Sequence, residues 1–156
     1  MGSEVYEGAA AVRVTRTYRA APAVVFKALT DPEMLAEWFA RAPGTPRGKV
    51  VTLDVRPGGS YLIEVVGPED HLTYRMQGTY REVVPRERLS FTWWYDRADF
   101  DPSLVTIELR ATGDGGTELT LTHALLPERM REPHRQGWEE CLTNIEAAIA
   151  PASATP

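Results

Sequence analysis

The three histidines are the side chains best suited to acid–base or metal chemistry near neutral pH. His71, His123 and His134 have no spacing that would place two of them on one face of a helix. The sequence contains no HExxH or CxxC motif, and the aspartates within 96–101 lack the glycine and final glutamate of a calcium-binding loop. The sequence therefore predicts no metal site and no cofactor.

The candidate nucleophiles also lie outside any catalytic motif. Ser60 follows two glycines but does not lie in a GxSxG nucleophile elbow, so the glycines indicate a turn before a strand. Cys141, the only cysteine, falls on the apolar stripe of an expected helix, where a thiol is usually a small, inert hydrophobic side chain. We therefore predict no catalytic residue.

Two polar residues interrupt the apolar faces of expected strands. Arg16 and His123 each share a strand face with apolar residues. Burying either side chain without partners would cost free energy or shift its pKa. Two interpretations follow. Carboxylates or carbonyls near the rim of the sheet pair with both residues, or both are polar anchors inside a cavity, with His123 as a general acid or base.

Residue patterning predicts the elements that would hold these side chains. Alternation indicates a first strand over residues 11–18, and Pro22 suits the first turn of a helix. Asp31 is placed to cap a second short helix that begins at Pro32. From residue 50 to 125 the period is two, with short turns between successive strands, which favours an antiparallel meander.

A long amphipathic helix is expected from about residue 130 to 150. Its apolar stripe consists of Trp138, Cys141, Leu142, Ile145 and Ile149. A sheet with one apolar face needs a cover, and only this helix is long enough, so we expect it to lie across a curved sheet.

The inward face of the sheet is expected to be rich in aromatic rings: Tyr61, Tyr74, Tyr80, Phe91, Trp93 and Tyr95. Phenol and indole groups need hydrogen-bond partners when they are buried. The rings therefore form either plain core or the lining of a cavity that admits an apolar molecule with one polar group.

Length and charge exclude several classes of protein. The 156 residues fit one domain, and 17 basic against 22 acidic residues give a net charge of −5, with no basic cluster for nucleic acid. No apolar run approaches the ~20 residues that span a bilayer. The acidic first residues have no apolar segment typical of a secretory signal, so we expect a cytoplasmic protein.

Several segments, in order and spacing, resemble the activator of heat shock protein 90 ATPase homologue family, within the START-like (SRPBCC, birch-pollen-allergen-like) superfamily. They are residues 16–22, 25–32, 38–39, 54–61, 78–83, 88–93, 116–123 and 137–142. The resemblance implies an α+β helix-grip fold, in which a curved antiparallel sheet wraps around a long C-terminal helix and two short helices follow the first strand. We expect a flexible lead over 1–10, one START-like domain over 11–150 and a disordered tail over 151–156.

The resemblance implies binding of a small hydrophobic or amphipathic ligand, lipid-like or aromatic, between the sheet and the last helix, without a defined catalytic activity. One alternative is a cavity-based cyclase, dehydratase or hydrolase. Another is stimulation of a heat shock protein 90 ATPase, against which only residues 1–10 precede the first expected strand. Homodimerisation stays open. The ligand-contacting residues expected from the inward face and the resemblance are Arg16, Trp38, Phe39, Tyr61, Tyr74, Met76, Trp93, Tyr95, His123 and Trp138.

Overall fold

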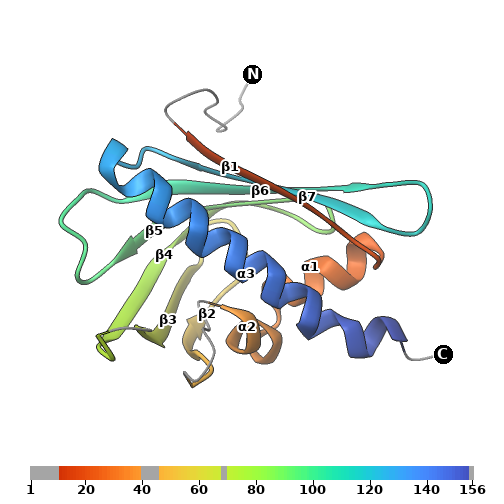
Figure 1. The fold of residues 1–156 in the computed structure, drawn as a ribbon, viewed down its shortest axis with the longest axis horizontal. Coiled ribbons are helices and arrows are strands. Elements are labelled where there is room, and N and C mark those ends of the chain that lie inside the picture. Colours follow the sequence, from red (N-terminus) through yellow and green to blue (C-terminus); the bar gives the residue numbers. More distant parts are fainter. Residues whose placement is uncertain (1–10, 40–45, 68–69, 155–156) are drawn as a thin grey trace.

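The computed structural model describes residues 11–39, 46–67 and 70–154, so the expected lead over 1–10 lies outside the described residues. Seven strands and three helices are described (Figure 1). In chain order they are β1 (Ala11–Tyr18), α1 (Pro22–Thr30), α2 (Pro32–Trp38), β2 (Lys49–Leu53), β3 (Ser60–Val66), β4 (Thr73–Val84), β5 (Arg88–Tyr95), β6 (Ser103–Ala111), β7 (Thr117–Ala124) and α3 (Glu128–Ala154).

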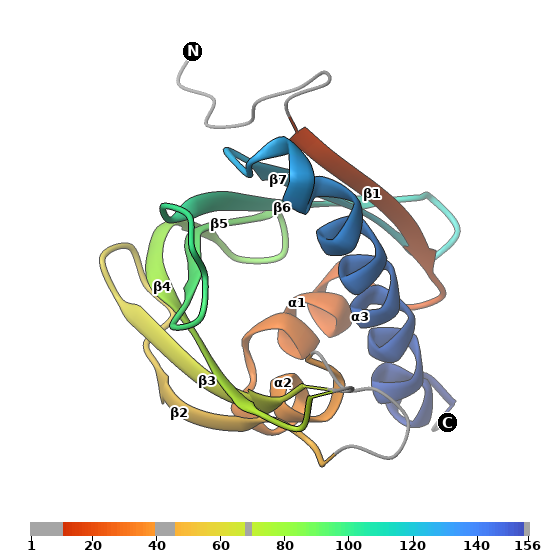
Figure 2. The ribbon, with the colours of Figure 1, turned by 60° about the vertical axis from the view of Figure 1, so that its left-hand side comes forward.

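The strands form one antiparallel sheet with the order β1-β7-β6-β5-β4-β3-β2. Strands β2 to β7 are consecutive neighbours, and β1 joins the far edge beside β7. The sheet curves around α3, with α1 and α2 between α3 and the β2 edge (Figure 2). This arrangement confirms the predicted α+β helix-grip fold and the antiparallel meander.

The two short helices begin as the sequence predicts. Pro22 opens α1 and Pro32 opens α2, where a missing backbone N–H costs nothing. The Asp31 carboxylate accepts a hydrogen bond of 3.1 Å from the backbone N–H of Met34 and so caps α2. The indole N–H of Trp38 donates to the carbonyl of Ala28 at 2.8 Å, which fixes the two helices to each other.

The last helix buries its predicted stripe against the sheet, since the five residues of that stripe are all at most 5% exposed. Helix α3 ends at Ala154 rather than near residue 150, so four residues of the expected tail are helical and residues 155–156 lie outside the description. Pro151 has a fixed φ that is compatible with a helix, although a proline removes one backbone donor and crowds the carbonyl one turn earlier. The neighbouring alanines have the highest helix propensity.

Gly78 leaves room for the side chain of Tyr61 to extend across strand β4. Tyr61 on β3 pairs with Gly78 on β4, and its hydroxyl donates to the carbonyl of Thr92 on β5 at 2.6 Å. A Cβ at Gly78 would lie 1.9 Å from that carbonyl oxygen and 2.8 Å from the Tyr61 ring. Gly78 is therefore required by close approach, and Tyr61 covers the strand at this point.

None of the helices described is long and apolar enough to cross a bilayer.

Candidate functional site

A partly enclosed cavity of about 390 Å³ lies between the first half of α3 and the ends of β3, β4 and β5. This volume is within the range typical of small-molecule sites. Six residues predicted to contact ligand line it: Phe39, Tyr74, Met76, Trp93, Tyr95 and Trp138. The sheet supplies four of these side chains from neighbouring strands, because residues two apart on a strand share a face.

Two further predicted residues lie deeper. Trp38 and Tyr61 line an inner space of only about 40 Å³, which shares Phe39, Trp93 and Trp138 with the larger cavity. Because this space is close to the size of one or two water molecules, the interior beneath α1 and α2 is nearly filled by side chains. Trp38 and Tyr61 therefore support the cavity wall from the core side.

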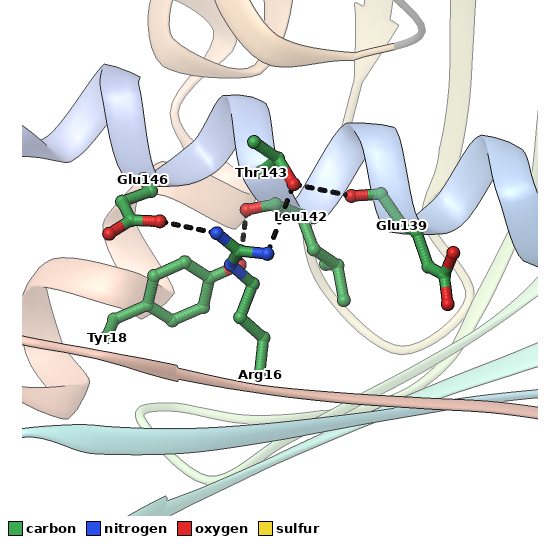
Figure 3. Close-up of polar contacts among 6 residues, drawn as sticks. All are labelled: Arg16, Tyr18, Glu139, Leu142, Thr143 and Glu146. Carbon is green, nitrogen blue, oxygen red and sulfur yellow. Dashed lines mark hydrogen bonds and ion pairs between the residues drawn. The ribbon is translucent and has the colours of Figure 1, made fainter.

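Arg16 lies against the other side of α3 and lines neither space. Its guanidinium pairs with the Glu146 carboxylate at 2.6 Å and donates to the Thr143 hydroxyl at 3.1 Å (Figure 3). Beside it, the Tyr18 hydroxyl donates to the carbonyl of Leu142 at 2.7 Å. Arg16 is therefore paired with a carboxylate, as in the first of the two interpretations, and these contacts hold β1 against α3.

His123 is fully buried behind the cavity wall and is also satisfied by protein groups. The indole N–H of Trp138 donates to Nδ1 at 2.9 Å, so Nδ1 carries no proton. The proton is then on Nε2, which lies 2.7 Å from the Ser103 hydroxyl, and that hydroxyl in turn donates to the carbonyl of Trp93 at 3.3 Å. Both imidazole nitrogens are engaged, so His123 fixes the orientation of Trp138 and has no free nitrogen for a ligand.

Burial holds this imidazole in its neutral form. The pKa of His123 is well below its usual value, chiefly because the charged form would lose its hydration and secondly because His134 is close. A neutral His123 is what the indole of Trp138 requires, since an imidazolium has no lone pair to accept its N–H.

His134 lines the cavity and was not predicted to contact ligand. Its Nδ1 lies 2.9 Å from the carbonyl of Met130, so Nδ1 carries the proton, and its ring stacks on Tyr95 at 6.2 Å. Burial lowers the pKa of His134, and the hydrogen bond to Met130 opposes that shift. The neutral ring keeps an unprotonated Nε2. The signal available in the sequence was its position four residues before Trp138, which puts both on one helix face.

Trp93 forms the centre of the cavity wall. Its ring lies 4.9 Å from Trp138, 5.6 Å from Phe39 and 6.5 Å from His134, measured between ring centroids. The side chain is 5% exposed, and its indole N–H has no hydrogen-bond acceptor among the described residues. Buried donors are nearly always paired in native proteins, so this N–H is a candidate to bind a ligand acceptor.

The mouth of the cavity carries a polar cluster. The Tyr74 hydroxyl donates to the Asp70 carboxylate, and the Arg97 guanidinium lies 5.4 Å from the centroid of the Tyr74 ring. The hydrogen bond from Tyr74 is the main reason that the pKa of Asp70 is below its usual value. Asp70 therefore stays anionic at the mouth, beside a cation.

Helix α3 leaves open space in the cavity wall at one position, Gly137. Gly137 lines the cavity, and a Cβ built there would meet no atom within 4 Å. Cys141, one turn further along the helix, also lines the cavity. Across the parts of the chain that are described, no cluster of three His, Cys, Asp or Glu residues could hold a metal ion.

A family described as Activator of Hsp90 ATPase homolog 1-like protein matches residues 19–150. The chain belongs to this family. The match begins in the turn after β1 and ends within α3, so it covers strands β2 to β7, both short helices and every residue that lines the cavity. This result confirms the family expected from the sequence segments.

Solved structures agree with the assignment to the Activator of Hsp90 ATPase homolog 1-like family. A protein from Chromobacterium violaceum is 29% identical, covers 88% of this chain and 95% of its own, and has a TM-score of 0.79. CalU16 from Micromonospora echinospora is 27% identical over 91% and 77%, with a TM-score of 0.67. Ms6760 from Mycobacterium smegmatis, at 22% identity over 96% and 98%, has the same fold, with a TM-score of 0.80. Comparison with curated proteins gave no match.

Proposed function

We propose that this protein binds a small, mainly apolar molecule with aromatic character in the cavity between the sheet and α3, without transforming it. The observation that carries the proposal is the cavity itself. It is about 390 Å³ in volume, and its walls include Phe39, Trp93, Tyr95 and Trp138. Aromatic walls with few polar groups are typical of small-molecule sites.

Gly137 supports the same function. Glycine in a helix interior costs ~1 kcal/mol relative to alanine, and here an alanine methyl would meet no neighbouring atom. The helix therefore forgoes stability that it could gain without a steric penalty. A site that must leave room for a ligand explains this choice, because sites of function often carry such a cost.

Binding of the neutral fluorescent probe N-phenyl-1-naphthylamine tests the proposal. We expect saturable binding to the wild-type protein, and Gly137→Leu should weaken it by about ten-fold or more, ~1.4 kcal/mol, because the leucine side chain occupies the cavity. Ala147→Leu is the matched control, since it introduces the same side chain at an exposed position of α3. Absence of saturable binding, or equal affinity in Gly137→Leu and wild type, would overturn the proposal.

The same preparation distinguishes the two alternatives. The described cavity offers one imidazole with a free nitrogen, His134, as a candidate acid or base, and a cavity-based enzyme would consume its ligand over time. The family description gives the third possibility a specific assay. A saturable rise in the ATPase rate of heat shock protein 90 on addition of this protein would favour the co-chaperone function.

A further inference from the structure

Two residues that line the same aromatic cavity, Trp93 and His134, each carry a side-chain nitrogen that no described residue engages. The Trp93 indole N–H is a donor only, is buried and has no acceptor among the described residues. On His134, the bond from Nδ1 to the Met130 carbonyl fixes the proton on Nδ1 and leaves Nε2 as an acceptor that no described residue engages. Two neighbouring residues of the cavity wall thus carry one donor and one acceptor that no described residue engages.

The two rings are neighbours in the cavity wall. Their centroids are 6.5 Å apart and their planes meet at 80°. An oxygen about 2.9 Å from each nitrogen can bridge nitrogens that lie up to about 5.8 Å apart. A hydroxyl group can do this, because its oxygen accepts one hydrogen bond while its proton donates another.

Other polar groups match the pair less well. A carboxylate or a ketone accepts from Trp93 but leaves its lone pairs facing the lone pair of His134. The carboxylates of Asp70 and Glu140 also line the cavity, so an anionic ligand would meet like charge. An ammonium group donates to His134 but leaves the Trp93 N–H without an acceptor.

We infer that the ligand is a hydroxylated aromatic compound, uncharged when bound, whose hydroxyl group accepts from Trp93 Nε1 and donates to His134 Nε2. The inference rests on the proposed binding function and names the chemical class of its ligand. The ring of the ligand packs among Phe39, Tyr95 and Trp138. Offset or edge-to-face ring contacts favour aromatic over aliphatic alcohols in such a cage.

Three probes of nearly equal size separate the two hydrogen bonds in wild-type protein. 2-Naphthol can make both, 2-methoxynaphthalene can only accept, and 2-methylnaphthalene can make neither. Isothermal titration calorimetry should show affinity falling in that order, with 2-naphthol at least about ten-fold tighter than 2-methylnaphthalene. Measurement at pH 7.5 or above, where His134 is neutral, keeps the acceptor available.

Two variants assign the hydrogen bonds. His134→Phe keeps a ring beside Tyr95, and it should bring 2-naphthol and 2-methoxynaphthalene to within about two-fold of each other. Trp93→Phe should remove the advantage of 2-methoxynaphthalene over 2-methylnaphthalene. Trp94→Phe is the matched control: the Trp94 indole donates to the Phe100 carbonyl and does not line the cavity. It should preserve the full order of affinities.

The wild-type series alone decides the inference, even where a variant fails to fold. Equal affinity for 2-naphthol and 2-methylnaphthalene would overturn the hydroxyl assignment while the proposed binding function stands. An order that survives unchanged in His134→Phe would also overturn it. Absence of saturable binding by all three probes would overturn the assignment and the proposed function together.

Discussion

His123 and His134 lie 5.2 Å apart between ring centroids, yet their partners give them different tasks. Protein groups engage both nitrogens of His123, so this residue positions Trp138 from behind the wall. His134 uses one nitrogen to bond its own helix and keeps the other for the cavity. Alternation alone could mark His123 as buried, but the sequence does not reveal which nitrogen has a partner.

At the scale of these residues, we predict that the protein loses stability as the pH falls below about 6.5. Burial lowers the pKa of both histidines in the folded state, so the unfolded chain binds more protons in this range. The free energy of unfolding then falls by up to ~1.4 kcal/mol per pH unit for each histidine. Urea denaturation at pH 7.5 and 5.5 measures the effect.

The control for this prediction is His134→Phe, which should show a shallower loss over the same interval because one of the two groups is gone. Asp70, Asp99 and Asp114 also have lowered pKa values, but carboxylates titrate in a more acidic range. A wild-type protein equally stable at both pH values would contradict the prediction.

We also predict that Arg16 does not take part in binding. Arg16→Met should leave the affinity for 2-naphthol within about two-fold of wild type. It should lower the free energy of unfolding by less than ~1 kcal/mol, because the ion pair with Glu146 is partly exposed and screened by solvent. Tyr18→Phe provides the comparison, since it removes a buried hydrogen bond to Leu142 and should cost ~1 kcal/mol. A ten-fold loss of affinity in Arg16→Met would place the guanidinium at the cavity after all.

At the scale of elements, the sequence is sufficient to predict those features of helices and strands whose cause lies in neighbouring residues. The cap at Asp31, the prolines at 22 and 32 and the alternation along β4 each follow from neighbouring residues, and the structure confirms all of them. The end of α3 depends on a balance between the cost of Pro151 in a helix and the high helix propensity of the alanines around it, so the expectation that the helix ends near residue 150 is wrong.

We predict that Gly137→Ala stabilises the protein by ~1 kcal/mol, since alanine is the better helix former and its methyl group meets no atom. The same methyl group enters the cavity, so the affinity for aromatic probes should stay equal or fall. Urea denaturation and calorimetry on one preparation measure both effects. A loss of stability would mean that the space beside Gly137 is already filled.

The glycine in β4 should behave in the opposite way. Gly78→Ala places a methyl group against the Thr92 carbonyl and the Tyr61 ring, so strands β4 and β5 must move apart. We predict a loss of about 1–3 kcal/mol in the free energy of unfolding, as for other overpacked sites. A neutral result would show that β4 and β5 separate at this point, and that Tyr61 moves aside, without cost.

At the scale of the whole molecule, the sequence predicted the sheet face that lines the cavity but not where the cavity ends. Tyr74, Trp93 and Tyr95 were found from alternation because neighbouring strands bring the same face together. Tyr61 lies on that sheet face too, and the family resemblance adds Trp38 from α2, but both line the small inner space that side chains nearly fill. The contribution of α3, above all His134 and Gly137, depends on how the helix is rotated over the sheet, which distant contacts such as Tyr18 with Leu142 determine.

A ligand in the cavity should also protect the only cysteine from alkylation. Cys141 is 5% exposed and lines the cavity, so a reagent reaches it through the space that the ligand would fill. We expect iodoacetamide to react slowly with native protein and more slowly still with 2-naphthol present, as followed by mass spectrometry. An unchanged rate at saturating 2-naphthol would mean that the probe binds elsewhere.

The closeness of Trp93 and Trp138, 4.9 Å between centroids at 53°, has an optical consequence. Electronic transitions of two indoles at this distance and angle couple, and the coupled pair gives paired bands of opposite sign in circular dichroism. These circular dichroism bands therefore report on the interior of the protein without a label, because they change when the angle between the two rings changes.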